Sequence, residues 1–343
     1  MKFTHFIFAA VMGVMTFASC QENITPENPA QEQEAYTVQL GFGGEWDVTY
    51  EPLTRGNDNN DLYGIQVYSA PNNEEKTTWS NYAYGLFDNV DNVTVSLLKG
   101  FKYKFVASMV VDGKDKLSNK NYVGFNAPFW ISGQDSRRGI VENLFNYSST
   151  DYFFYLGSGD TFLEGLSGNF YHPNTERFYG ELLDYVPEES SNDKAKIHMK
   201  RTSFGAKFIA QGKLATAGRL EVLMTEAPAI SIDLAQEKQH DDIYTFYNVK
   251  AAYDYQTGNY EEDIDVSINW HYDTEDGEVT VPLGTHKITY KRNATTVVKI
   301  NLENTNVEGG LGFELAETGA MVDGDEYVIN DGGNVDTEID TNH

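Results

Sequence analysis

The chain has 343 residues, a formal net charge of −27 and a single cysteine. So acidic a surface repels nucleic acid and anionic lipid headgroups, and we expect no nucleic-acid partner and no electrostatic membrane binding. One cysteine cannot form an intramolecular disulfide, so stability must come from burial of apolar side chains. A chain of this length is expected to form two domains.

The N-terminus has the pattern of a lipoprotein signal peptide. Lys2 supplies a positive charge, and residues 6–17 form an apolar run too short to span a bilayer. The residues Phe-Ala-Ser directly precede Cys20. We therefore predict that residues 1–19 are removed and that Cys20 is acylated with palmitate, so that two or three acyl chains anchor the protein to a membrane. The alternative is that Cys20 is a buried free thiol.

The segment after the lipidated cysteine is predicted to be a flexible tether. Residues 21–35 contain no basic and no aromatic residue and only one sizeable aliphatic residue. Such a segment cannot bury enough apolar surface to fold. Residues 20–35 therefore act as a spacer between the membrane and the folded domains.

From Tyr36 onward, short runs alternate apolar and polar residues and are bounded by clusters of Gly, Asn, Asp and Pro. This pattern is typical of half-buried strands in an antiparallel β-sandwich. The strands expected in the first series cover residues 36–42, 46–50, 62–68, 82–87, 93–97 and 103–111.

A region rich in aromatic residues and glycine follows, from residue 145 to residue 185. We interpret it as the end of the first domain, with short helical turns at residues 163–166 and 181–185. Residues 187–193 are polar and contain proline and serine, which is typical of a linker.

A second series of strands begins near Lys196. The expected strands cover residues 197–200, 206–211, 220–224, 230–234, 244–249, 264–272, 286–290 and 296–302. The predicted fold is all-β, with two tandem antiparallel sandwich domains at residues 36–190 and 191–343. The second domain ends in an acidic tail without Lys or Arg, from residue 308 onward.

The motifs that carry chemistry are missing. The seven histidines lack the HExxH and HxH spacings of zinc sites, and no GxSxG, P-loop or GxGxxG occurs. The acidic turns at residues 58–61 and 273–278 offer oxygen ligands of the kind calcium prefers, but neither has EF-hand spacing. Turn residues in an acidic protein produce such clusters by chance. We predict no catalytic site, no metal and no cofactor.

The order of the motifs resembles a known family. After the lipidation motif and the acidic tether come the loop Leu53-Thr54-Arg55-Gly56 and the strand sequence Asp-Leu-Tyr-Gly-Ile-Gln-Val-Tyr at residues 61–68. The apolar turn at residues 181–185 precedes a strand sequence at residues 197–207. This order is similar to that of the fimbrillin-like proteins of Bacteroidales, the Mfa-like and FimA-like pilin families, although Gly56 stands where alanine is common.

The resemblance implies two transthyretin-like β-sandwiches in an exported lipoprotein. In polymerising members, an arginine-specific protease cuts after the loop arginine, the first strand is lost, and a strand of the next subunit fills the groove. Here the cut would fall between Arg55 and Gly56. Arg55 is the one basic residue between Cys20 and Lys76, in a polar loop of the kind proteases cut. The alternative is an ordinary exposed arginine in an uncleaved lipoprotein.

The expected function is that of a fimbrial or pilus-like subunit, or an anchor or tip lipoprotein, at the outer membrane and cell surface. Its expected partners are membrane lipid through Cys20, other fimbrial subunits, and a host or glycan ligand. The segment 311–329 is the expected donor strand. The alternative is a glycan-binding surface lipoprotein that uses Trp79, Trp130 and Trp270. A flat exposed row of aromatic rings would favour that alternative.

Overall fold

The computed structural model describes the chain from Glu34 to Leu302 with gaps, and three short strands beyond. The described ranges are 34–44, 60–73, 76–90, 93–119, 124–132, 139–148, 152–188, 195–211, 218–256, 260–302, 313–315, 328–329 and 335–336. The described residues from Ala35 onward belong to one compact unit. The signal peptide, Cys20, the expected strand 46–50 and the loop with Arg55 and Gly56 all lie outside the described residues.

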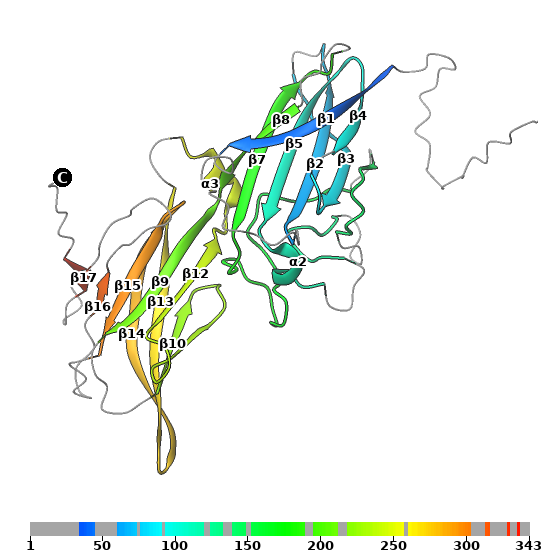
Figure 1. The fold of residues 1–343 in the computed structure, drawn as a ribbon. Helices are drawn as coiled ribbons and strands as arrows, with labels where there is room; N and C mark the ends of the chain where they lie inside the picture. The colour runs from blue at the N-terminus through cyan, green and yellow to red at the C-terminus, as the bar shows by residue number, and fades with distance from the viewer. Residues whose placement is uncertain are drawn as a thin grey trace, which may run out of the picture. The chain divides into compact units, whose positions relative to one another are not determined.

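The described regular structure is almost entirely β, which confirms the predicted all-β sandwich fold (Figure 1). Most pairs of described strands are antiparallel, and two of these pairs are parallel. The two short helices in the described part of the chain are α2 (Gly113–Lys116) and α3 (Val249–Asp254). No helix there is long and apolar enough to cross a bilayer.

The first group of strands is ordered β4-β1-β8-β7-β5-β2-β3-β6. These strands are β1 (Ala35–Gly44), β2 (Leu62–Pro71), β3 (Ser80–Phe87), β4 (Thr94–Leu98), β5 (Phe101–Val110), β6 (Asn146–Tyr147), β7 (Arg177–Tyr185) and β8 (Ala195–Arg201).

Strands β2 and β5 at the centre of this group are buried on both faces. On one face, Ile65 and Phe105 pack in a cluster that β1 and β4 cover. On the other face, Leu62 and Val106 pack against side chains from the connections after β5. Strands with two buried faces carry near-continuous apolar runs in place of alternation.

The second group of strands forms two sheets around one core. The four-stranded sheet is ordered β11-β10-β13-β14, and the six-stranded sheet β12-β9-β15-β16-β17-β18. Their bounds are β9 (Ser203–Gln211), β10 (Arg219–Met224), β11 (Ile230–Asp233), β12 (Gln239–Thr245), β13 (Glu261–Thr274), β14 (Gly277–Lys291), β15 (Thr295–Asn301), β16 (Phe313–Leu315), β17 (Val328–Ile329) and β18 (Val335–Asp336).

Several sequence expectations are corrected by the structure. Residues 181–185, expected as a helical turn, belong to strand β7. The strand was not recognised in the sequence because the start of β7 is buried on both faces and shows no alternation of apolar and polar residues. Residues 163–166 form a turn.

The strand expected at residues 244–249 ends earlier, because β12 ends at Thr245 and α3 begins at Val249. The Asn248 side chain accepts a hydrogen bond from the amide of Ala251 at the start of this helix. Strand β8, expected in the second series, pairs with β7 and β1. The division at 190/191 stays a prediction.

Candidate functional site

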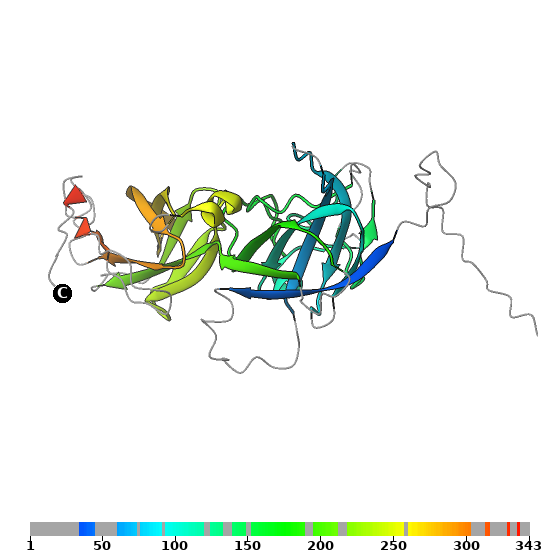
Figure 2. The ribbon, with the colours of Figure 1, turned by 90° about the horizontal axis from the view of Figure 1, so that it is seen from above.

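The candidate site is the position of β1, which connects the two layers of the first sandwich. Its first half pairs antiparallel with β4, from Ala35–Leu98 to Gln39–Thr94. Its second half pairs parallel with β8, from Leu40–Ala195 to Gly44–Met199. Figure 2 shows β1, in dark blue, along one side of this group of strands. This ten-residue strand therefore pairs with two different strands, one along each half of its length.

The side chains of β1 fill the first core at alternate positions. Val38 and Leu40 are buried, and Tyr36 and Phe42 pack against the same cluster while partly exposed. Full burial of a valine or leucine side chain contributes about 1.5–3 kcal/mol each. Without β1, the apolar side chains of β4 and β8 in this cluster would face an open groove; they include Val95, Leu97, Ile197 and Met199.

The predicted processing site lies between β1 and β2 in the sequence. Strand β1 ends at Gly44 and β2 begins at Leu62, so Arg55 falls in the connection between them. A cut between Arg55 and Gly56 would separate β1 from every later strand. The cut would also separate Cys20, and with it any lipid, from the rest of the chain.

None of the three tryptophans named for glycan binding is fully exposed, and Trp130, like Trp79, is half-buried. Trp270 is buried in the second core with its ring centroid 4.4 Å from that of Tyr272. Trp79 is half-buried, and the ammonium groups of Lys102 and Lys104 lie 5.7 and 5.9 Å from its ring centroid. The glycan-binding alternative stays a prediction that these positions do not favour.

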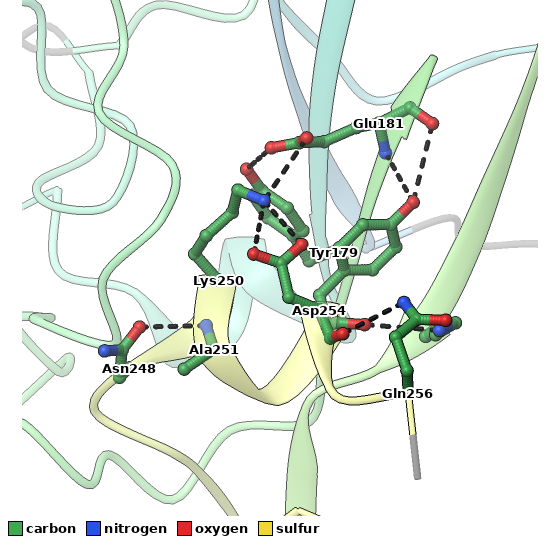
Figure 3. A network of polar contacts seen from close by, with 9 residues as sticks. Tyr179, Glu181, Asn248, Lys250, Ala251, Asp254 and Gln256 are labelled. Atoms are coloured by element: carbon green, nitrogen blue, oxygen red, sulfur yellow. Dashed lines mark hydrogen bonds and ion pairs between the residues drawn. The ribbon is translucent and has the colours of Figure 1, made fainter. Parts of the chain in front are cut away.

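A charged network fastens α3 to β7 (Figure 3). Lys250 on α3 contacts Glu181 on β7 at 3.4 Å and Asp254 at 2.5 Å, and Tyr179 donates to Glu181 at 2.6 Å. The phenol of Tyr253 lies 3.3 Å from the backbone amide nitrogen of Glu181.

Burial and the neighbouring Glu181 carboxylate raise the pKa of Tyr179. Partial burial alone would lower the pKa of Lys250, but the hydrogen bonds and charges of Asp254 and Glu181 raise it. Each charged group in the network thus has a partner, which suits a structural contact better than acid–base catalysis.

The buried histidines also have structural partners. The ring of His172 lies between the Thr225 carbonyl and the Glu262 carboxylate, at 3.1 Å from each. The ring of His271 contacts Glu221 at 3.3 Å. Among the described residues, no three His, Cys, Asp or Glu side chains are grouped as metal ligands. The acidic turn at residues 273–278 belongs to the β13–β14 hairpin, and the turn at 58–61 is described only from Asn60.

Sequence reasoning found β1 by its alternation but did not find its neighbours. The partners β4 and β8 are separated from β1 by about 50 and 150 residues of sequence, and no local signal pairs them. The parallel pairing of β1 with β8 was likewise not predicted.

Comparison with solved structures finds fimbrial proteins of Bacteroidales. A fimbrial assembly protein from Parabacteroides distasonis is 9% identical, covering 83% of this chain and 97% of its own, with a TM-score of 0.35. The fimbrial anchor protein Mfa2 from Porphyromonas gingivalis is 6% identical, covering 85% and 98%, with a TM-score of 0.35. The tip fimbrial protein Mfa3 from the same organism is 8% identical, covering 75% and 94%, with a TM-score of 0.26.

These neighbours are fimbrial proteins, the class that the sequence resemblance names, and none of the three is described as an enzyme. No protein-family model matches the chain, and no curated protein matches it. At such identities and TM-scores, the similarity does not by itself assign a family or a function.

Proposed function

We propose that this chain is a cell-surface structural subunit of a fimbrium, exported as a lipoprotein and assembled by replacement of β1. The observation that carries the proposal is the place of β1. It fills a groove between β4 and β8 with alternate apolar side chains. Its covalent link to the later strands is the connection that contains Arg55.

Replacement of β1 is physically sound. Unpaired strand edges bind extended segments through main-chain hydrogen bonds, while alternate pockets select side chains. An open edge is normally an aggregation liability, and in a fimbrial subunit it becomes the assembly site. The replacing strand must carry large apolar residues at alternate positions, as β1 does. The segment 311–329, with Leu311, Phe313 and Leu315, is the proposed donor; its residues 313–315 form β16 on the edge of β15.

Lipidation at Cys20 and cleavage at Arg55 give this chain two alternative roles. Uncleaved, it stays at the outer membrane as an anchor. Cleaved, it loses its lipid and joins the fimbrium, with other subunits as partners. No catalytic activity is part of either role.

The test is limited digestion of the mature protein with an arginine-specific protease, followed by light scattering. Ordered oligomers from wild type but not from Arg55→Lys support the proposal. Arg55→Lys keeps the charge but removes the cleavage site, and Arg219→Lys is the control at an arginine that is partly exposed within strand β10. A chain that is cut at Arg55 and stays monomeric would contradict polymerisation.

Anchoring has a separate test. Labelled palmitate should be incorporated into the wild type and not into Cys20→Ala. Equal incorporation into both would remove the lipid anchor from the proposal.

A further inference from the structure

The outer edge of β4 has unusual partners. Within the described residues, β1 is the one strand that pairs with β4, so the opposite edge of β4 faces no strand. Backbone groups alternate between the two edges along a strand. Those of Ser96 and Leu98 point away from β1, where an edge strand is usually open to a foreign strand.

Three tyrosine hydroxyls, from β3, β5 and β6, form hydrogen bonds with these backbone groups. The Ser96 amide donates to Tyr147 Oη at 2.8 Å, and Tyr82 Oη donates to the Ser96 carbonyl at 2.7 Å. The Leu98 amide donates to Tyr103 Oη at 2.6 Å, and Tyr103 Oη donates to the Leu98 carbonyl at 3.1 Å. All four outward groups of the two residues thus have a partner.

The three rings support one another. The ring of Tyr82 packs edge-on against Tyr103 at 5.2 Å and against Tyr147 at 5.6 Å between centroids. Tyr103 is fully buried, Tyr82 is half-buried and Tyr147 is 44% exposed. Burial first, and then the neighbouring Tyr147, raise the pKa of Tyr82 to about 12, so its hydroxyl stays protonated and able to donate at physiological pH.

We propose that Tyr82, Tyr103 and Tyr147 form a tyrosine clamp that closes the outer edge of β4 and holds β4 in place when β1 is absent. The inference rests on the proposed function, because it concerns the groove that β1 would leave. With the outer edge closed, the free hydrogen-bonding edge of β4 is the one inside the groove. The partner that fits is one extended strand with large apolar residues at alternate positions, running antiparallel to β4 and parallel to β8.

The clamp accounts for a problem that strand replacement raises. Without β1, β4 would lose its one described strand partner and could collapse into the core or pair with a foreign strand on its outer side. Side-chain hydrogen bonds from β3, β5 and β6 do not depend on β1. They preserve the groove wall and direct strand addition to one edge.

The first measurement is amide hydrogen exchange of the mature, uncut chain. The amides of Ser96 and Leu98 should be protected in wild type and should exchange at least about tenfold faster in the Tyr82→Phe/Tyr103→Phe/Tyr147→Phe variant, since each loses a hydrogen bond. The amides of Val95 and Leu97, which face β1, should stay protected. Tyr290→Phe is the matched control, because the Tyr290 hydroxyl is buried and has no hydrogen-bond partner in the described part of the chain.

If the triple variant does not fold, Tyr147→Phe provides the same test at Ser96, because Tyr147 is partly exposed. Unchanged exchange at Ser96 and Leu98 after loss of the hydroxyls would overturn the clamp.

The second measurement concerns the groove. The chain is cut after Arg55 and mixed with a synthetic peptide of residues 34–44. Binding to the cut wild type, with at least about tenfold weaker binding to the cut triple variant, supports the proposal. Equal binding to both overturns the role of the clamp in the groove. No binding to the cut wild type, with the exchange result intact, contradicts strand replacement and leaves the edge closure standing.

Discussion

Strands β1 and β9 hold the same position in the two groups of strands. Each begins its group and pairs in parallel with the last long strand of that group, β1 with β8 and β9 with β15. Each also pairs antiparallel with a second strand, β4 or β12. They differ in how the chain holds them. Strand β9 follows β8 after the single residue Thr202, whereas β1 lies between the tether and the connection with Arg55.

The largest side chains that β9 buries in its core are also larger than those that β1 buries. Strand β9 contributes Phe204 and Phe208 to the second core, both fully buried, where β1 contributes Val38 and Leu40. Phe204 lies within 4.6–5.8 Å, centroid to centroid, of the rings of Tyr244, Phe246 and Tyr290. Under the proposed function, the strand at this topological position is permanent in the second group, as β9, and becomes replaceable in the first group, as β1, once the bond after Arg55 is cut.

The largest effect is expected at the permanent strand. Phe204→Ala should lower the free energy of unfolding by about 3–5 kcal/mol, because it removes a ring from a packed aromatic cluster and leaves a cavity. Urea denaturation followed by circular dichroism measures this loss. Phe204→Leu should cost clearly less. A loss for Phe204→Ala below that of the corresponding change in β1 would break the comparison.

The corresponding change is Leu40→Ala. We expect a loss of about 2–3 kcal/mol, at the low end for a buried leucine, because β1 lies beside the edge strand β4 and can relax. Hydrogen exchange should show faster opening confined to residues 35–44, with β9 unchanged. Thr37→Ala, at an exposed position of the same strand, is the control. Equal loosening of β9 would mean that β1 is not a separable element.

A smaller effect is expected where β9 meets β15. A Cβ added to Gly205 would overlap Thr295 Oγ1 and lie 3.0 Å from Thr295 Cβ. Gly205→Ala should therefore cost about 1–3 kcal/mol by overpacking. Thr295→Ala in the same chain should restore most of the stability, as thermal unfolding would reveal. Failure of this rescue would show that the cost has another source.

The smallest expected effect is a pH-dependent contribution of one carboxylate to the stability of the first group of strands. Burial alone would raise the pKa of Asp88 in the first group, but hydrogen bonds from Lys114 at 2.6 Å and Asn143 at 2.8 Å lower it. A carboxyl with a lowered folded-state pKa contributes stability above its unfolded pKa of about 3.9, and loses it as the pH falls through the folded value.

Asp88→Asn should therefore cost less than about 1 kcal/mol at pH 7 and nothing in strong acid. Thermal unfolding at both pH values measures it, with the exposed Asp184→Asn as control. A difference that persists in strong acid would exclude the ionised carboxylate as its cause.

The sequence predicted most of the strands correctly. Strands such as β1, β4 and β10 have one buried face, so alternation and turn residues mark them without knowledge of their partners. Strand β7 was missed along its whole length, because Phe178 and Tyr179 are both buried, on opposite faces, and no alternation marks its start. Helix α3 was missed because it is only six residues long, with Val249 and Ala252 packed in separate clusters.

By itself, the sequence determined the all-β class. It also predicts the lipidation residue Cys20 and the processing residues Arg55 and Gly56, which stay predictions. Such modification sites are local, because an enzyme that acts on an exposed segment reads only a few neighbouring residues. Only the tertiary structure decided that β1 fills a groove between β4 and β8, and that Tyr82, Tyr103 and Tyr147 close the outer edge of β4. The pairings of β1 and the contact of Tyr147 with Ser96 join residues more than 50 positions apart, and the packing of whole sheets selects such partners. Tyr82 and Tyr103 lie nearer in sequence to their partners on β4, but only the three-dimensional positions of β3, β4 and β5 bring their hydroxyls to its outer edge.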